Sequence, residues 1–223
     1  MIQLENVWKE YKLDTEITYT ALKNINVSID HGEFTAIIGP SGSGKSTLMH
    51  LIGLLDKPSQ GKIKINDQDV SRLDDNSIST LRNEFVGFVF QQFNLINKLT
   101  VLENILLPTI YARKRLGYKP EEKARYLLER FGIKGKENSY PNKISGGQQQ
   151  RVAIARSLIM EPDLILADEP TGNLDTKTGD EIIKLFGELN KEEKITIVLV
   201  THEPDVAART RRQIKIVDGQ IAK

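Results

Sequence analysis

The fold of this chain is decided by the stretch Phe34-Thr-Ala-Ile-Ile-Gly-Pro-Ser-Gly-Ser-Gly-Lys-Ser-Thr-Leu-Met-His-Leu-Ile-Gly53. Residues 34–38 are mostly apolar and branched, which is typical of a short buried strand. Residues 46–53 have the pattern of a helix. Between them, residues 39–46 match G-x-x-x-x-G-K-[ST] at every fixed position. A strand, a glycine-rich loop and a helix in this order predict a phosphate-binding loop (P-loop) in an α/β protein.

The residue types of this loop suit the phosphates of a nucleotide. Glycines allow the backbone to wrap phosphates with its N–H groups, and the N-terminus of the following helix adds positive potential. Lys45 is expected to reach the β- and γ-phosphates, and Ser46 is expected to ligate Mg²⁺. The residues expected to contact the nucleotide are Gly39, Ser41, Gly42, Ser43, Gly44, Lys45, Ser46 and Thr47.

An acidic pair follows a second apolar run. Residues 164–167 read as a strand buried on both faces, and Asp168 and Glu169 stand at its C-terminal end. Mg²⁺ is usually held by one or two carboxylates together with phosphates and water, so Asp168 is the candidate metal-associated carboxylate. Glu169 points elsewhere and is the candidate general base for an attacking water. The alternative is a solvated acidic turn before Pro170.

A second glycine turn, Ser145-Gly146-Gly147-Gln148, lies about twenty residues before the acidic pair. It offers a further set of backbone N–H donors for phosphate, with a serine at its mouth. A P-loop by itself indicates only that a nucleotide binds. The second turn therefore indicates a narrower class within the nucleotide-binding proteins.

Six motifs in this order and spacing resemble those of ATP-binding-cassette (ABC) ATPases, and the resemblance covers essentially the whole chain. The motifs are the P-loop, Gln91 after the run 86–90, the run Ile144-Ser-Gly-Gly-Gln148, Asp168-Glu169, Asn173-Leu-Asp175 and His202. Ile144 replaces the usual leucine, and Asn173 stands where a small residue is common. Neither departure affects the catalytic assignment. The resemblance implies ATP and Mg²⁺ as the ligands.

The resemblance also assigns roles to residues outside the P-loop. Gln91, rather than the neighbouring Gln92, is expected to sense Mg²⁺ and the attacking water and to link the catalytic core to a helical subdomain. The signature turn 145–148 is expected to cap the γ-phosphate of ATP bound to the opposite subunit. Asp175 is expected to communicate across a dimer, and His202 to contact the γ-phosphate.

An aromatic residue that stacks on adenine is the last expectation from the resemblance. Tyr11 stands at the family's position, and Tyr19 is the nearby competitor. By analogy with base stacking, such a contact contributes roughly 1–3 kcal/mol. His31 and His50 have no partners at ligand spacing and are expected to be structural.

Composition excludes several classes of protein. The chain of 223 residues is long enough for one domain with an inserted subdomain. Its 31 basic and 30 acidic residues nearly balance, so no nucleic-acid partner is expected. It has no cysteine, which excludes disulfides and thiolate metal sites. The sequence shows no secretory signal and no apolar stretch near the ~20 residues that cross a bilayer.

The motif positions predict the organisation of a single ABC ATPase domain over residues 1–223. The expected catalytic core, 1–91 and 161–223, has a mainly parallel sheet and an N-terminal antiparallel β subdomain, with an inserted α-helical subdomain at 92–160. The parallel strands are expected at 34–38, 85–90, 164–167 and 195–201. Residues 1–30 and 61–65 are expected to form antiparallel strands, and residues 214–221 a terminal hairpin turning at Asp218-Gly219.

The predicted function is ATP hydrolysis within a symmetric head-to-tail homodimer that binds two ATP molecules between its subunits. Within the family, the runs 53–58, 90–96, 99–104 with Leu107-Pro108, and 168–175 most resemble the branch of macrolide exporters and lipoprotein-release complexes. That branch implies a separate integral-membrane permease as partner and a cytoplasmic, peripheral location on the inner face of the cell membrane. The alternative is a soluble ABC ATPase that acts on DNA or ribosomes. A P-loop kinase would not need the turn at 145–148.

Overall fold

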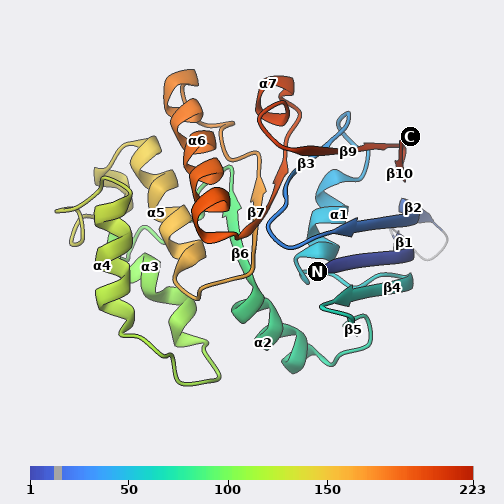
Figure 1. Ribbon diagram of the computed structural model, residues 1–223, viewed down its shortest axis with the longest axis horizontal. Helices are drawn as coiled ribbons and strands as arrows, with labels where there is room; N and C mark the ends of the chain where they lie inside the picture. The colour runs from blue at the N-terminus through green and yellow to red at the C-terminus, as the bar shows by residue number, and fades with distance from the viewer. Residues whose placement is uncertain (13–16, 223) are drawn as a thin grey trace.

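The computed structural model describes residues 1–12 and 17–222, and its central layer is a six-stranded sheet (Figure 1). The strand order is β10-β9-β3-β8-β7-β6, in which the strands from β9 to β6 run parallel and β10 pairs antiparallel with β9. The strands are β3 (Phe34–Ile38), β6 (Val86–Phe90), β7 (Leu164–Asp168), β8 (Thr196–Val200), β9 (Arg212–Val217) and β10 (Gln220–Ile221). The predicted parallel strands are confirmed to within one or two residues.

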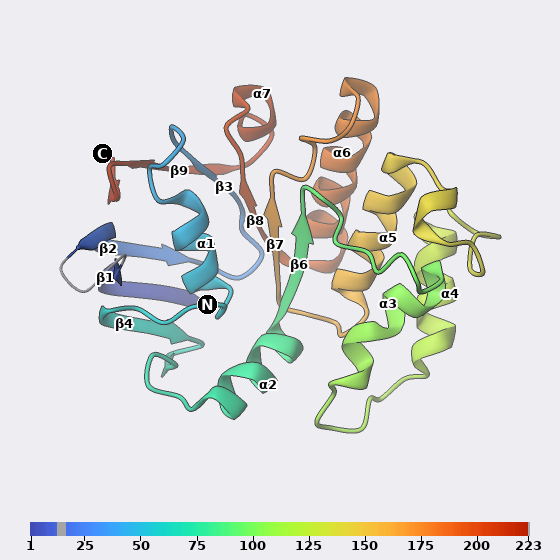
Figure 2. The same ribbon diagram turned by 180° about the vertical axis from the view of Figure 1, so that it is seen from behind.

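Four of the parallel strands, β3, β6, β7 and β8, are buried on both faces because alternate side chains enter two different cores. In β7, Leu164 and Leu166 face one core, while Ile165 and Ala167 face the other. Helix α1 (Lys45–Ile52) packs against the first face, and helices lie on the second (Figure 2). This two-sided burial explains why these strands are apolar at nearly every position.

The second, antiparallel sheet has the order β2-β1-β4-β5 and lies on the other side of α1. Its strands are β1 (Ile2–Lys12), β2 (Thr18–Ile29), β4 (Gln60–Ile65) and β5 (Gln68–Asp69). Buried residues of this sheet, such as Leu4 and Ile25, share one core with Leu48 of α1. The N-terminal antiparallel subdomain is therefore confirmed, although residues 13–16 of the predicted segment 1–30 lie outside the described part.

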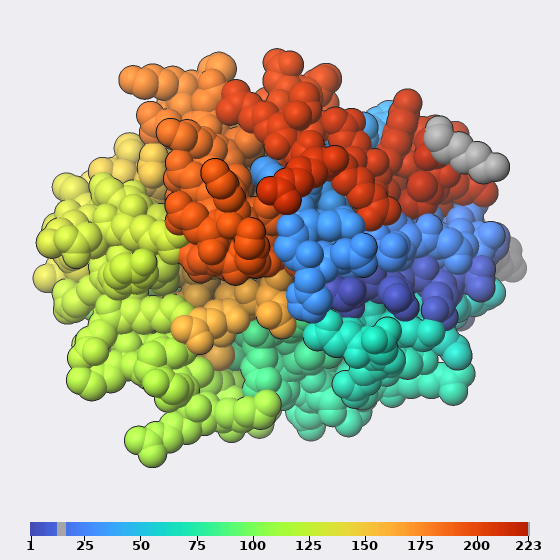
Figure 3. Space-filling model, in the orientation of Figure 1, coloured from blue at the N-terminus to red at the C-terminus, as the bar shows by residue number. Residues whose placement is uncertain are grey.

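Helices cover the opposite face of the parallel sheet and one end of the molecule, whereas the N-terminal strands cover the other end (Figure 3). These helices are α3 (Val101–Ile110), α4 (Pro120–Arg130), α5 (Gly146–Leu158) and α6 (Thr176–Glu193), and η1 (Pro141–Lys143) is a short 3₁₀ turn. Helix α2 (Asp75–Phe85) precedes β6, and α7 (Pro204–Ala207) follows β8. The predicted segment 92–160 contains α3, α4, η1 and α5; its separation as a subdomain remains a prediction.

The C-terminal segment differs in part from the expectation. β9 and β10 form the predicted hairpin, and its turn residues Asp218 and Gly219 have φ of 47° and 77°. A turn with positive φ at both central residues matches the twist of a hairpin. However, β9 also pairs in parallel with β3, beside the P-loop strand. β9 is short, and its polar side chains lie on one face. The sequence therefore did not indicate that it is a fifth parallel strand.

The loop that leads into α3 is held by Asn104, the last residue of the run 99–104 on which the predicted branch partly rests. Its fully buried amide accepts from Ile96 N at 2.7 Å and donates to Ile96 O, Leu99 O and Thr100 O at 3.1, 3.1 and 2.9 Å. Thr100 and Glu103 form a capping box at the start of the same helix. This part of the run thus serves the local structure.

Replacing Asn104 by alanine should lower the free energy of unfolding by about 2–4 kcal/mol, because several part-buried backbone groups lose the partner that the buried amide gives them. Urea denaturation followed by circular dichroism measures the change. Asn76→Ala, at an exposed position in the first turn of α2, is the control and should change stability by no more than about 0.5 kcal/mol. Equal losses for the two variants would contradict the structural role of Asn104.

Candidate nucleotide-binding site

The P-loop lies between β3 and α1 and depends on glycine at two close approaches. Gly44 caps α1 with φ of 106°, in the left-handed region that favours glycine, and a Cβ there would lie 2.8 Å from Ala21 O. A Cβ on Gly39 would lie 2.1 Å from the carbonyl oxygen of Ile216. The glycines therefore fit the loop against two neighbouring strands, in addition to keeping its backbone open to phosphate.

The C-terminal hairpin supports the P-loop through hydrogen bonds. Gly219 N donates to Ser43 O at 3.0 Å, and Lys23 N donates to Gly219 O at 2.7 Å. The turn at Gly219 thus links the P-loop to β2. Sequence analysis identified the turn but missed this function, because the contact joins residues far apart in the chain.

The loop borders a cavity of about 250 Å³, lined by Tyr19, Ser41, Gly42, Gly44, Lys45, Ser46, Thr47, Glu169 and Val200. Lys45 is buried, and its ammonium group donates to the carbonyl oxygens of Gly39 and Pro40, each at 2.9 Å. The buried hydroxyl of Ser43 has no partner within the described residues. The cavity therefore combines a cation, hydroxyl groups and a helix N-terminus, which together suit a polyphosphate.

Asp168 is the last residue of β7, and the next residue, Glu169, lines this cavity. Burial raises the pKa of the Asp168 carboxyl, and the charge of Glu169 raises it further, while His50 and Lys45 act in the opposite direction. A divalent cation beside Asp168 would reverse this shift, since it favours the charged carboxylate. His50 thus lies close enough to influence Asp168, a proximity that its spacing in the sequence did not indicate.

Glu169 is held by its backbone in an unusual conformation. Its φ of 43° is in the left-handed region, which costs a non-glycine residue of order 1–3 kcal/mol. Its N–H donates to Val200 O at 2.9 Å, and its carbonyl accepts from Gly172 N at 3.0 Å. Its Oε1 lies 2.7 Å from Nδ1 of the exposed His202. The predicted base and the predicted switch histidine are therefore in direct contact.

Gln91 comes directly after β6, which is the strand adjacent to β7. Its side chain packs against Gly172, where a Cβ would lie 2.5 Å from Gln91 Nε2. Its carbonyl oxygen accepts from Asn173 Nδ2 at 2.9 Å. Asn173, the departure from a small residue, therefore ties the segment before Asp175 to Gln91. Only the fold brings these residues together, so sequence reasoning missed the contact.

The turn at 145–148 forms the first turn of α5, which begins at Gly146. Ser145 is the N-cap and forms a capping box with Gln148: Gln148 N donates to Ser145 Oγ at 3.3 Å, and Ser145 N donates to Gln148 Oε1 at 3.0 Å. A Cβ on Gly147 would lie 2.5 Å from the methyl carbon of Thr178. None of the residues 145–148 lines the P-loop cavity.

Asp175 has a local role that the resemblance did not imply. It caps α6, accepting from Thr178 N at 3.1 Å and from Thr178 Oγ1 at 2.6 Å. These hydrogen bonds lower the pKa of the Asp175 carboxyl. The residue is exposed, so it caps the helix and also faces the surface.

Tyr11 and Tyr19 are cross-strand partners on β1 and β2. Tyr19 lines the P-loop cavity and is 47% exposed. The hydroxyl of Tyr11 donates to Asp56 Oδ2 at 3.0 Å, and its pKa is raised by burial and by this bond. Lys9 lies 4.9 Å from the centre of the Tyr11 ring and pairs with Asp56. The polar network of Lys9, Tyr11 and Asp56 was not anticipated from the sequence.

A family model described as "ABC transporter" matches residues 22–172 of this chain. The chain belongs to the ABC transporter family. An uncharacterized ABC transporter ATP-binding protein of Methanocaldococcus jannaschii is 49% identical to it, over 100% of this chain and 96% of the relative. The lipoprotein-releasing system ATP-binding protein LolD 1 of Rhodopseudomonas palustris is 44% identical, over 100% and 98%.

A longer relative carries the cassette as one part. The macrolide export ATP-binding/permease protein MacB of Bdellovibrio bacteriovorus is 45% identical, over 99% of this chain but 33% of its own length. Among solved structures, a dimeric ATP-binding cassette in a post-hydrolysis state, bound to ADP and Pi, has a TM-score of 0.90 and 46% identity. It covers 100% of this chain and 97% of that chain.

The predicted α/β fold and the ABC ATPase activity are thereby confirmed. This ABC cassette binds and hydrolyses ATP as a transporter subunit, and a soluble ATPase acting on DNA or ribosomes is not favoured. Within residues 1–12 and 17–222, no helix has both the length and the apolar character required to span a bilayer.

The two tyrosines can be tested as adenine-stacking residues. We expect Tyr11→Ala to raise the KM for ATP at least about 5-fold with little change in kcat, because stacking is present in both the ground state and the transition state. Tyr11→Phe, which removes the bond to Asp56 but keeps the ring, should leave KM nearly unchanged. Steady-state ATPase assays give both constants. If Tyr19→Ala alone raises KM, the stacking role belongs to Tyr19.

Proposed function

We propose that this cassette is the ATPase of a transporter of the lipoprotein-release or macrolide-export kind, and that it drives a permease carried on another chain. The support is its similarity to LolD 1, which spans 98% of that relative, and to the cassette portion of MacB. The observation that best supports ATP hydrolysis at this site is the contact between Glu169 and His202 at the edge of the P-loop cavity.

The proposed reaction is attack of water on the γ-phosphorus of ATP. Glu169 accepts a proton from the water as its oxygen bonds to phosphorus, and the bond from phosphorus to the β–γ bridging oxygen breaks. ADP leaves with the bridging oxygen, and the water oxygen remains on the phosphate. Lys45, which now contacts loop carbonyls, exchanges them for phosphate oxygens. His202 orients Glu169 through Nδ1 and leaves its other ring nitrogen for the γ-phosphate.

Mg²⁺ fits the oxygen-bearing side chains at the carboxyl edge of the sheet. Ser46, Gln91 and Asp168 supply a hydroxyl, an amide oxygen and a carboxylate, which are hard ligands of the type that Mg²⁺ prefers. Asp168 is the last residue of β7, and Gln91 follows the adjacent strand β6, so both belong to one edge. When bound, the ion would neutralise charge on the β- and γ-phosphates.

The site is proposed to be shared between two copies of the chain. The turn 145–148 caps an exposed helix end and does not line its own P-loop cavity, so its free N–H groups suit the phosphates of a partner copy. The dimeric cassette found among the similar structures supports this arrangement. Two ATP molecules would then lie between two subunits related by a two-fold axis.

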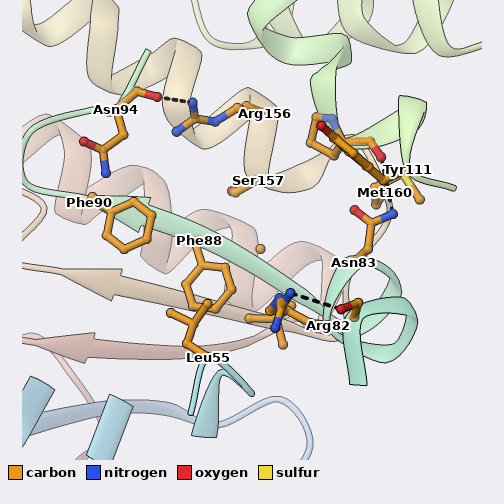
Figure 4. Close-up of a pocket in the computed structure, with 14 residues that line it drawn as sticks. Leu55, Arg82, Asn83, Phe88, Phe90, Asn94, Tyr111, Arg156, Ser157 and Met160 are labelled. Carbon is orange, nitrogen blue, oxygen red and sulfur yellow. Dashed lines mark hydrogen bonds between the residues drawn. The ribbon is translucent and has the colours of Figure 1, made fainter. Parts of the chain in front are cut away.

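The permease is proposed to dock in a groove beside Gln91. The groove has a volume of about 680 Å³ and lies between α2 and β6 on one side and α3 and α5 on the other. Phe88 and Phe90 stack with centroids 5.7 Å apart; Figure 4 shows them near Leu55, with Tyr111 and Met160 on the opposite wall. The residues that line it are Leu55, Ser79, Arg82, Asn83, Val86, Gly87, Phe88, Phe90, Asn94, Pro108, Tyr111, Arg156, Ser157 and Met160.

The chemistry of the groove defines its proposed occupant. Among these described lining residues there are two arginines and no acidic side chain. Arg82 and Arg156 donate to the carbonyl oxygens of Leu54 and Asn94, so carboxylates do not neutralise them there. A short cytoplasmic helix of the permease, with apolar side chains and one carboxylate, would complement this surface. Docking there places the cassette at the inner face of a cell membrane.

The shared site is tested by Glu169→Gln, which keeps the size of the side chain but removes its basicity. Turnover should fall about 10²-fold or more, in line with roughly 10²–10⁴ for a general base. The variant should also form a dimer that depends on ATP, because repulsion of the γ-phosphate is relieved. Gel filtration with and without ATP measures this shift.

Two additional substitutions make this test specific. In the Glu169→Gln background, Ser145→Arg should abolish the dimer, since a bulky side chain blocks the face that meets the partner's ATP. Lys45→Ala should abolish it as well by removing a phosphate contact. A dimer that persists with Ser145→Arg would disprove the shared site, and full turnover in Glu169→Gln would exclude Glu169 as the base.

The groove is tested with two exposed tyrosines. Tyr111→Ala should weaken co-purification with the membrane permease by about 10-fold or more, because Tyr111 lines the groove and is 70% exposed. Tyr126→Ala is the matched control, since Tyr126 is 59% exposed on α4 and does not line the groove. Quantitative pull-down from detergent extracts measures both. If the two variants lose equal amounts of permease, the groove is not the docking site.

A further inference from the structure

Gln150 is a fully buried polar residue in α5 whose hydrogen bonding is incomplete. It lies two residues beyond the signature turn, and its exposed fraction is 0%. Its Nε2 donates to Pro170 O at 2.6 Å, whereas its Oε1 has no partner in the part of the chain that the structure describes. The side chain thus makes one strong bond, to the residue that follows Glu169.

Stability does not account for this arrangement. A buried carbonyl oxygen without a partner costs at least as much free energy as one neutral hydrogen bond contributes. A methionine of similar length would fill the same space without a polar atom. The presence of an amide is therefore better explained by the hydrogen bond from its Nε2 to Pro170 O than by a contribution to the stability of the core.

Nε2 holds the carbonyl oxygen of Pro170, the residue that follows the strained residue Glu169. Backbone bonds to Val200 and Gly172 fix the N–H and the carbonyl of Glu169. Pro170 has no N–H, so its carbonyl oxygen is the only backbone group through which it can be anchored by a hydrogen bond. A left-handed non-glycine conformation persists only where its surroundings over-determine it. Gln150 supplies the constraint on the C-terminal side.

We propose that Gln150 is a positioning residue that links helix α5 to the catalytic base Glu169. When the N-terminal end of α5 binds the partner's ATP, this link orients the side chain of Glu169 in the same chain. This inference rests on the role proposed for Glu169. The link is short: Ser145 caps α5, Gln150 lies in the second turn of that helix, and its amide contacts Pro170. Each site of the dimer then senses the other through one side chain.

The test compares Gln150→Met with Gln149→Met. Gln149 is the adjacent residue of the same helix; its Nε2 donates to Ile144 O at 3.3 Å and makes no bond to Pro170. We expect Gln150→Met to lower kcat at least 10-fold with the KM for ATP and the melting temperature nearly unchanged, because a small misplacement of a catalytic group is sufficient. Gln149→Met should behave as the wild type. A lower melting temperature with unchanged kcat, or equal losses of kcat in both variants, would overturn the proposal.

A second variant keeps the proposal testable if methionine disturbs folding. Gln150→Glu retains the shape but donates to Pro170 O only when its carboxyl is protonated. Burial favours the neutral form of a carboxyl, so turnover relative to the wild type should recover as the pH is lowered from 8 to 6. A relative turnover that does not change with pH would contradict the role of the donor.

The Glu169→Gln background separates this inference from the proposed function. There, Gln150→Met should cause no further loss of turnover, because a positioning residue has no base left to position. A further 10-fold loss in that background would show that Gln150 acts by another route, and would overturn the inference while leaving Glu169 as the base. Full turnover in Glu169→Gln alone would instead remove the proposed function on which the inference rests.

Discussion

Burial of the parallel sheet on both faces is the constraint on which the rest of this structure depends. Because β3, β6, β7 and β8 have a core on each side, their side chains pack into these cores. The polar residues of the site are therefore found at the carboxyl ends of these strands and in the loops that follow. The P-loop, Gln91, Asp168-Glu169 and His202 all follow such ends. The residues proposed to carry the chemistry therefore converge from distant parts of the chain, because the order and direction of the strands place them at one edge of the sheet.

The predictable features were those that a short run of residues encodes. The P-loop could be predicted from residues 34–53, and the buried strands from apolar runs such as 164–167, because local sterics and two-sided burial determine both. The parallel pairing of β9 with β3 could not be predicted, since its polar outer face resembles an ordinary hairpin strand. The contacts from Asn173 to Gln91 and from Gln150 to Pro170 span 82 and 20 residues, and no local pattern signals them.

The structure also separates local roles from shared ones within a single motif. Ser145 and Gln148 satisfy the capping requirements of α5, and Asp175 satisfies those of α6, so each would be favoured for its helix alone. The same positions are exposed at helix starts, where free N–H groups suit an anion. Helix capping and the proposed phosphate binding use the same polar helix ends, so one short sequence can serve both.

The hydrogen bond from Gly219 to Ser43 has a consequence for synthesis on the ribosome. β3 and the P-loop emerge early, but β9 and the turn that supports Ser43 are supplied by residues 212–219. The ribosome adds about 5–20 residues per second, starting from the N-terminus. The nascent cassette therefore cannot complete its P-loop until roughly 175 further residues have been added, a delay on the order of ten seconds or more. A topology that brings these two distant segments together thus keeps an incomplete chain from acquiring a finished nucleotide site.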